Sequence, residues 1–158
     1  MATTPVFNRT IVLRGEYNIF EDTCGSSAIK PGMLINRITG QPGNIPVVIP
    51  HAVSGGRGAN QIATEQPLNS GGTVDTAYAA GDVVRSHVAK SGDIVNVLVK
   101  SGQSLKVGTP LISNGDGTFI ASAAADSIIN TQKVFGEAWI DTPTGTLAAD
   151  TLVAMLVW

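Results

Sequence analysis

The apolar residues of the chain lie in short runs, and residues typical of turns separate these runs. The four strongest runs cover residues 83–88, 94–99, 134–140 and 152–158, and each has the length of a β-strand. A sustained helical spacing of apolar residues does not occur, and the best helical candidate is the segment 121–130. The pattern therefore predicts an all-β chain that forms a small barrel or sandwich.

Glycine marks the expected turns between these runs. The triplet Lys-Ser-Gly ends at Gly92 and again at Gly102, and residues 30–33 resemble it. In such turns glycine supplies the positive φ that other residues avoid. The sequence Asn-Gly-Asp-Gly is the strongest hairpin signal, and it predicts a strand at 110–113 that pairs with a strand at 118–121.

The first part of the chain has a different character, because prolines and glycines interrupt every apolar run. We expect an extended N-terminal arm at residues 1–15 and a loop-rich β segment at 16–72 that packs on the barrel. Residues 73–158 are expected to form the compact β-barrel domain. An extended arm of about 13 residues reaches up to ~45 Å.

Composition narrows the class of protein. Of 158 residues, 43% are apolar, which argues against intrinsic disorder, but only 14% are charged. Such a low charge density suits a surface that partner proteins cover. The net charge of -2 argues against free nucleic acid as a partner. The sequence shows neither a signal peptide nor an apolar run long enough to span a membrane, so we expect no membrane partner.

Residues that carry chemistry are few. Cys24 is the single cysteine, and His51 and His87 are the two histidines, which excludes an internal disulfide and a three-histidine metal site. No phosphate-binding loop, nucleophile elbow or zinc-protease motif occurs. A thiolate pair between Cys24 and a histidine stays open, but we favour an inert cysteine and a buried, hydrogen-bonded His87. We predict no enzyme activity, no cofactor and no metal.

One stretch of the chain resembles a known family. Residues 102–117 read Gly-x-x-Leu-x-x-Gly-x-Pro-Leu-x-Ser-x-Gly-x-Gly, and a Gly-Glu-Ala segment at 136–138 and a terminal apolar strand follow. This pattern is similar to that of the capsid decoration proteins of tailed bacteriophages, also called head-stabilisation or cement proteins. Those that it resembles contain a small β-barrel domain known as a β-tulip. The resemblance extends over residues 76–158.

The resemblance implies a structural protein of the virion. Such a protein binds the outer surface of the expanded capsid and stabilises the shell by bridging major capsid subunits. Its expected partners are the major capsid protein and further copies of itself, as a homotrimer at three-fold sites, with a dimer at two-fold sites as the alternative. The protein would be made in the host cytoplasm and reside on the outer capsid surface.

The N-terminal arm supplies the candidate interface residues. We expect the contacts with the capsid or with a second copy to come from Pro5, Val6, Phe7, Arg9, Ile11, Val12, Leu13 and Arg14. An arm of this kind adds a strand to the sheet edge of a neighbour through main-chain hydrogen bonds. The alternative is that the arm packs on its own barrel as an edge strand. If it binds a neighbour, removal of residues 1–14 should abolish capsid binding and leave thermal unfolding nearly unchanged.

A second function class fits the same composition, namely a carbohydrate- or receptor-binding β module of a virion spike or fibre. Trp139 and Trp158 are the side chains that would stack on sugar rings. Both belong to apolar runs, however, so we expect them to pack in the core.

Overall fold

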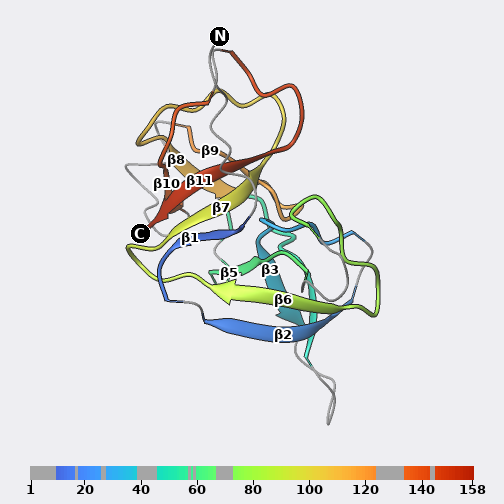
Figure 1. Ribbon diagram of the computed structural model, residues 1–158. Coiled ribbons are helices and arrows are strands. Elements are labelled where there is room, and N and C mark those ends of the chain that lie inside the picture. Colours follow the sequence, from blue (N-terminus) through green and yellow to red (C-terminus); the bar gives the residue numbers. More distant parts are fainter. Residues whose placement is uncertain are drawn as a thin grey trace.

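The protein is built from strands joined by turns, which confirms the predicted all-β class (Figure 1). The computed structural model describes residues 10–16, 18–25, 28–38, 46–56, 58, 60–66, 73–123, 134–142 and 145–158. Its strands are β1 (Val12–Arg14), β2 (Ile19–Cys24), β3 (Ile35–Ile38), β4 (Val47–Pro50), β5 (Gln61–Ala63), β6 (Val83–Val88), β7 (Ile94–Val99), β8 (Pro110–Ser113), β9 (Phe119–Ala121), β10 (Val134–Ala138) and β11 (Thr151–Val157).

The later strands begin and end close to where the apolar runs predict. β6, β7 and β8 have the predicted bounds, and β9, β10 and β11 differ from prediction by one or two residues at an end. Gly92 and Gly102 have φ values of 91° and 84°, as their turns require. Of the helical candidate, Ala121 ends β9, and residues 124–130 lie outside the described residues.

Strands β7 to β11 form a small closed barrel. Their order is β7-β11-β10-β8-β9, and a parallel pair between Val99 and Phe119 joins β9 back to β7. The barrel is complete without β1, which is a sixth strand that pairs antiparallel with the first half of β7. Figure 1 shows β1 lying alongside β7, between the barrel and the second sheet.

Strands β2 to β6 form the second sheet, in the order β3-β4-β2-β6-β5. All neighbours are antiparallel except β2 and β4, which run parallel. An isolated bridge between Leu34 and Ile62 joins its two edge strands, and the Ala63 N–H donates to the Met33 carbonyl oxygen at 2.9 Å. This sheet therefore also curls until its edges meet.

The chain passes from the second sheet to the barrel at a later position than the expected boundary at residue 73. β6 lies within the 73–158 segment, yet it pairs with β2 and β5 in the second sheet. The crossing to the barrel comes between Val88 and Ile94. The described part of the arm also pairs outside the segment expected for it, because β1 belongs to the sheet of the barrel. The division of the chain into separate domains stays a prediction.

One hydrophobic cluster serves both sheets. It contains barrel residues such as Val97 and Phe119 together with Leu34, Ile62 and Val74, which come from the first half of the chain or the connection after it. A smaller cluster that includes Cys24 and Tyr78 fills the second sheet, so the cysteine is buried as expected. Because the larger core is shared, neither sheet buries its apolar face alone.

Both histidines are buried where the two sheets meet, which confirms the interpretation of His87. Its Nδ1 accepts a hydrogen bond from the Asn18 backbone N–H at 3.3 Å, so Nε2 donates to the Asp93 carboxylate at 3.2 Å. His51 follows β4, and its Nδ1 lies 2.8 Å from the Ser113 hydroxyl on β8. Each histidine thus links one sheet to the other.

Candidate functional site

Part of the predicted interface lies inside the protein itself. Ile11 is fully buried in the shared core and Val12 is buried as well, whereas Leu13 is half-buried and Arg14 is exposed. Residues 12–14 therefore pack as an edge strand on their own barrel, which is the alternative stated for the arm. The remaining candidates, Pro5, Val6, Phe7 and Arg9, lie outside the described residues.

Two polar side chains hold the start of this strand. The Glu65 carboxylate accepts from the Thr10 hydroxyl at 2.8 Å and from the Ile11 N–H at 3.0 Å. The Asn96 side chain donates to the Thr10 carbonyl oxygen at 2.8 Å, and its backbone N–H donates to the Ile11 carbonyl oxygen at 2.7 Å. We call Glu65 and Asn96 the strand clamp.

The sequence contains little that reveals the strand clamp. Glu65 is 54 positions from Ile11 in the chain, and Asn96 interrupts the apolar run of β7. That interruption is the one available signal, because a polar residue in a fully buried strand needs a hydrogen-bond partner. The clamp fixes the position of Thr10, the first residue that the structure describes.

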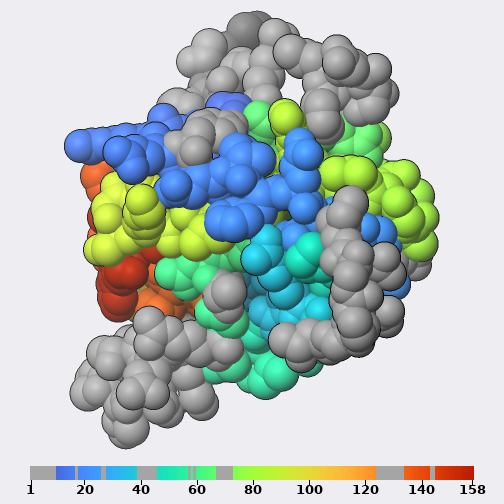
Figure 2. Space-filling view, turned by 90° about the horizontal axis from the view of Figure 1, so that it is seen from below, coloured from blue at the N-terminus to red at the C-terminus, as the bar shows by residue number. Residues whose placement is uncertain are grey.

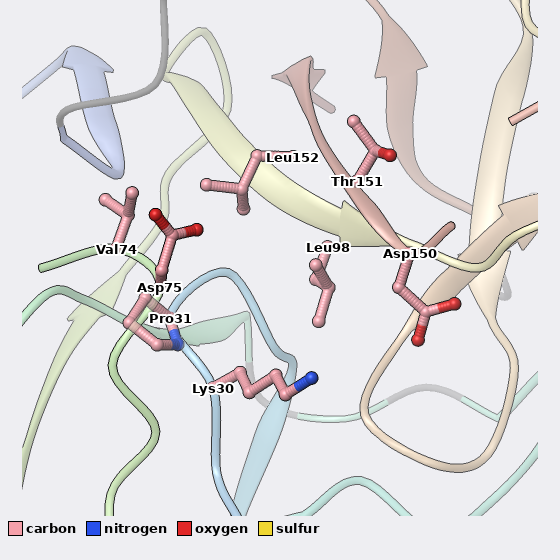
Figure 3. A pocket seen from close by; sticks show the side chains of 8 residues that line it. All are labelled: Lys30, Pro31, Val74, Asp75, Leu98, Asp150, Thr151 and Leu152. Atoms are coloured by element: carbon pink, nitrogen blue, oxygen red, sulfur yellow. The ribbon is translucent and has the colours of Figure 1, made fainter. Parts of the chain in front are cut away.

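A pocket lies where the loop before β3 and the connection before β6 meet strands β7 and β11. Its volume is about 240 Å³, and its lining combines apolar side chains with a charged rim (Figure 3). The apolar part consists of Pro31, Val74, Leu98 and Leu152, and the polar part of Lys30, Asp75, Asp150 and Thr151. Figure 3 shows the Lys30 side chain extending toward the side of the pocket on which Asp150 lies.

The acidic side of the rim continues into an ion-pair network. Lys100 Nζ lies 3.1 Å from Asp116 and 3.7 Å from Asp150. Burial alone would raise the pKa of Asp116, but hydrogen bonds from the Thr118 side chain and backbone, and then from Lys100, hold it well below its usual range. The hydrogen bond to Asp116 in turn raises the pKa of Lys100. Asp116 and Lys100 therefore stay charged at neutral pH.

The tryptophans lie at the surface, which corrects the expectation that they pack in the core. Trp139 is 45% exposed and Trp158 is 49% exposed. Trp139 directly follows Ala138, the last residue of β10, and Trp158 directly follows Val157, the last residue of β11. Ala138 and Val157 both point into the core. Because successive side chains of a strand point to opposite faces, the tryptophans point outward.

A row of side chains also lies exposed on the second sheet. Thr23 on β2 lies opposite Val83 on one side and Val47 on the other, and Val47 lies opposite Ile38. Paired residues share one face of a sheet, so these four side chains form a row across four strands. Ile38 and Val83 are exposed. Figure 2 shows the molecule from below, with the blue residues near the N-terminal end of the described chain extending across this face.

A buried ion pair supports the inner side of the same sheet. The Asp22 carboxylate is buried, and Arg37 reaches it with Nε at 3.1 Å and a terminal nitrogen at 3.0 Å. Gln61 donates to the same carboxylate at 2.9 Å. The Arg37 guanidinium also lies over the half-exposed Phe20 ring, 4.7 Å from its centroid. Sequence reasoning missed this group, because its members come from three strands far apart in the chain.

Within the described ranges, no cluster of three or more His, Cys, Asp or Glu side chains suits a metal ion. The same residues include no helix that is long and apolar enough to cross a membrane. Cys24 lies in the second-sheet cluster, whereas His51 contacts Ser113 and His87 contacts Asp93. These contacts give His87 the buried, hydrogen-bonded role that the sequence predicts for it, and His51 has a similar role.

Comparison with known proteins gives a likeness in fold. No protein-family model matches the chain, and no curated protein sequence does. Among solved structures, the fold is similar to the N base of the head fiber protein gp8.5 of bacteriophage phi29, with a TM-score of 0.57. The likeness covers 90% of this chain and 95% of that chain, at 16% sequence identity. At this identity the shared property is the fold, over nearly the full length of both chains.

Proposed function

We propose that this chain is a structural protein of a bacteriophage virion, attached to the outer surface of the head. The observation that carries the proposal is the fold shared with the base of a phage head fiber over 90% of the chain. The resemblance of residues 102–117 to capsid decoration proteins points to the same class independently. The proposed role is non-enzymatic and needs no cofactor.

In the decoration form of this proposal, the protein binds across junctions between major capsid subunits as a homotrimer. Binding to the assembled, expanded shell alone stabilises that state by mass action, by about 2.7 kcal/mol per site at a hundredfold excess over Kd. The low charge of the chain and the exposed row that includes Ile38 and Val83 suit such a covered surface.

A second form has a specific observation in its favour. In it, the chain is the base of a fibre or a receptor-binding module. Trp139 and Trp158 are half-exposed rather than buried in the core, so their rings are available to a sugar or to another protein. Free nucleic acid and membranes are not proposed as partners in either form.

The first test is co-sedimentation of the purified protein with undecorated, expanded heads of its phage. Saturation at a fixed number of copies per shell is expected, and the ratio to major capsid subunits separates trimers at three-fold sites from dimers at two-fold sites. A failure to bind intact heads would remove the proposal in both forms.

A second measurement separates the two forms. Decoration predicts that bound protein raises the temperature at which heads lose their DNA, whereas a fibre base predicts binding without that change. A glycan screen, repeated with Trp139→Ala, tests the receptor-binding form. Specific glycan binding that the substitution removes would favour it, and heads stabilised to the same degree by the variant would favour decoration.

A further inference from the structure

Two connections between the described strands carry the chain from one sheet to the other, and they lie side by side. The first crossing leads from the end of β1 on the barrel to the start of β2, and the second leads from the end of β6 to the start of β7. An ion pair between Glu16 and Lys90, at 3.4 Å, joins them at the surface. The Val88 N–H also donates to the Asn18 carbonyl oxygen at 3.1 Å.

The His87 ring lies between the two crossings and contacts both. Its Nδ1 accepts from the backbone N–H of Asn18 in the first crossing at 3.3 Å, and its Nε2 lies 3.2 Å from the Asp93 carboxylate in the second. The ring is 0% exposed. A backbone N–H can only donate, so this arrangement requires a neutral ring with its hydrogen on Nε2.

The Asp93 carboxylate is itself fixed in position. It accepts from the Lys90 N–H at 2.8 Å within its own turn. Gly15, in the first crossing, lies so close that a Cβ atom there would collide with Oδ1 of Asp93, and its φ of 137° also favours glycine. The carboxylate is therefore held as an acceptor for Nε2 of His87, whatever the charge of the ring.

Asp93 is the charged group in contact with the His87 ring. The residues opposite His87 on the neighbouring strands are apolar, namely Ile19 on β2 and Ile62 on β5. Arg14, at the end of β1, is exposed. The other charged side chains near the crossings form ion pairs with one another at the surface, which are Glu16 with Lys90 and Glu21 with Arg85.

We propose that His87 is a pH-sensitive switch that holds the first crossing only while its ring is neutral. Histidine is the side chain whose charge ordinarily changes between pH 5 and pH 8. A further proton must bind to Nδ1, because Nε2 already carries its hydrogen. The protonated Nδ1 would then face the Asn18 N–H as donor against donor, so this hydrogen bond is lost. The inference does not depend on the proposed function.

Protonation acts differently on the two crossings. In the second, the contact between Nε2 and Asp93 becomes a charge-assisted hydrogen bond and persists. The first keeps only the backbone bond from Val88 to Asn18 and the exposed ion pair of Glu16, within the contacts described here. Acid should therefore loosen the connection between β1 and β2 while the pairing of β7 with β11 stays intact.

NMR spectroscopy of the unmodified full chain between pH 8 and pH 4.5 tests the proposal. The ring nitrogen shifts of His87 report its protonation, and hydrogen exchange gives the protection factor of the Asn18 N–H. We expect this factor to fall at least tenfold as Nδ1 takes up its proton. The Lys100 N–H, which donates to the Phe119 carbonyl oxygen within the barrel, is the control and should keep its protection.

Three results of this experiment would overturn the proposal. The first is constant protection of Asn18 while the ring titrates, and the second is a ring that stays neutral down to pH 4.5. The third is an equal loss of protection at Lys100, which would show that acid unfolds the whole protein.

A pair of variants assigns the effect to one histidine. In His87→Asn the side-chain carbonyl oxygen can replace Nδ1 as the acceptor and does not titrate, so the protection of Asn18 should no longer depend on pH. The matched control is His51→Gln, which replaces the other buried histidine and should keep the wild-type pH dependence. A pH dependence that survives in His87→Asn would refute the assignment. The measurement on the unmodified chain stands by itself if either variant fails to fold.

Discussion

At the scale of single residues, Tyr78 in the smaller hydrophobic cluster combines burial with two hydrogen bonds. The Tyr78 hydroxyl donates to the Thr64 carbonyl oxygen at 3.0 Å and accepts from the Arg85 N–H at 3.3 Å. Burial is the main cause that raises its pKa to about 12. Tyr78 is therefore held in its neutral form well above the pH at which an exposed tyrosine ionises.

Replacing this hydroxyl should reduce stability in a pH-dependent way. Tyr78→Phe leaves two buried backbone groups without their partner, so we expect a loss of about 1–3 kcal/mol at neutral pH. Because the folded-state pKa is raised above the unfolded value of 10.0, the wild-type advantage is complete below pH 10 and falls as the pH approaches 12. Urea unfolding of both proteins between pH 7 and 11 measures the difference. Parallel pH profiles would contradict this assignment.

The stability contribution of Asp116, in the hairpin turn, should depend on pH with the opposite sign. The pKa of Asp116 is lowered, so its contribution is complete above the ordinary pKa of 3.8 and disappears as the pH falls further. Asp116→Asn should cost at most about 1 kcal/mol at pH 7, since the carboxylate is partly exposed and water screens its ion pair with Lys100. Thermal unfolding at pH 7 and pH 2.5 is the measurement. A difference in stability between the two proteins that grows toward pH 2.5 would contradict this prediction.

Expectations about single residues are confirmed where the neighbouring residues in the sequence determine the local structure. Glycine turns and a hydrogen-bonded His87 follow from local sequence, because a tight turn needs positive φ and a polar residue in an apolar strand needs partners. The expectation that the tryptophans pack in the core is wrong. An apolar run does not bury every member, since alternation along β10 and β11 turns Trp139 and Trp158 outward.

At the scale of elements, the bounds of the strands are accessible from the sequence and their partners are not. β7 is apolar except for Asn96 and lies between two glycine-containing turns, so its limits follow from the sequence. The assignment of β6 to the second sheet and of β1 to the barrel depends on contacts between distant parts of the chain. No local pattern encodes such pairing, because a strand edge accepts any partner whose register buries the correct face.

The structure changes the expected effect of truncating the arm on the stability of the protein. Removal of residues 1–14 would take the fully buried Ile11 from the shared core, so we expect a loss of about 2–5 kcal/mol instead of unchanged stability. Removal of residues 1–9 keeps Ile11, Val12 and the strand clamp, and should leave the unfolding temperature within a few degrees of wild type. Calorimetry of the two truncated chains tests this. Equal stability of both would show that β1 contributes nothing to the barrel.

The shorter truncation is also the cleaner test of function. It removes Pro5, Val6, Phe7 and Arg9, and we expect it to leave the barrel intact because β1 and the strand clamp are kept. Loss of capsid binding by this chain would therefore assign the contact to the segment itself. The clamp variant Glu65→Gln serves as a control, because it weakens the anchoring of Thr10 and Ile11 while leaving every residue of the segment in place.

At the scale of the whole molecule, the two sheets share their interior. Leu34 and Ile62 of the second sheet lie in the same cluster as the barrel residues Val97 and Phe119. The buried hydrogen bonds from His51 to Ser113 and from His87 to Asp93 cross the same boundary. Exposing the shared core costs free energy in both parts at once, so partial unfolding of either sheet is unfavourable.

This arrangement predicts a single cooperative unfolding transition, and the chain carries a natural probe of each sheet. Trp139 and Trp158, the only tryptophans, report on the barrel, and Cys24, the only cysteine, is buried in the second sheet. Tryptophan emission and the reactivity of the Cys24 thiol should therefore change at the same urea concentration, as two-state unfolding requires. Two separate midpoints would show that the barrel and the second sheet unfold independently. In that case an isolated 73–158 segment would contain the strands of the closed barrel but would leave β6 without β2 as its partner. The boundary between the two unfolding units would then lie between Val88 and Ile94, where the chain crosses from one sheet to the other.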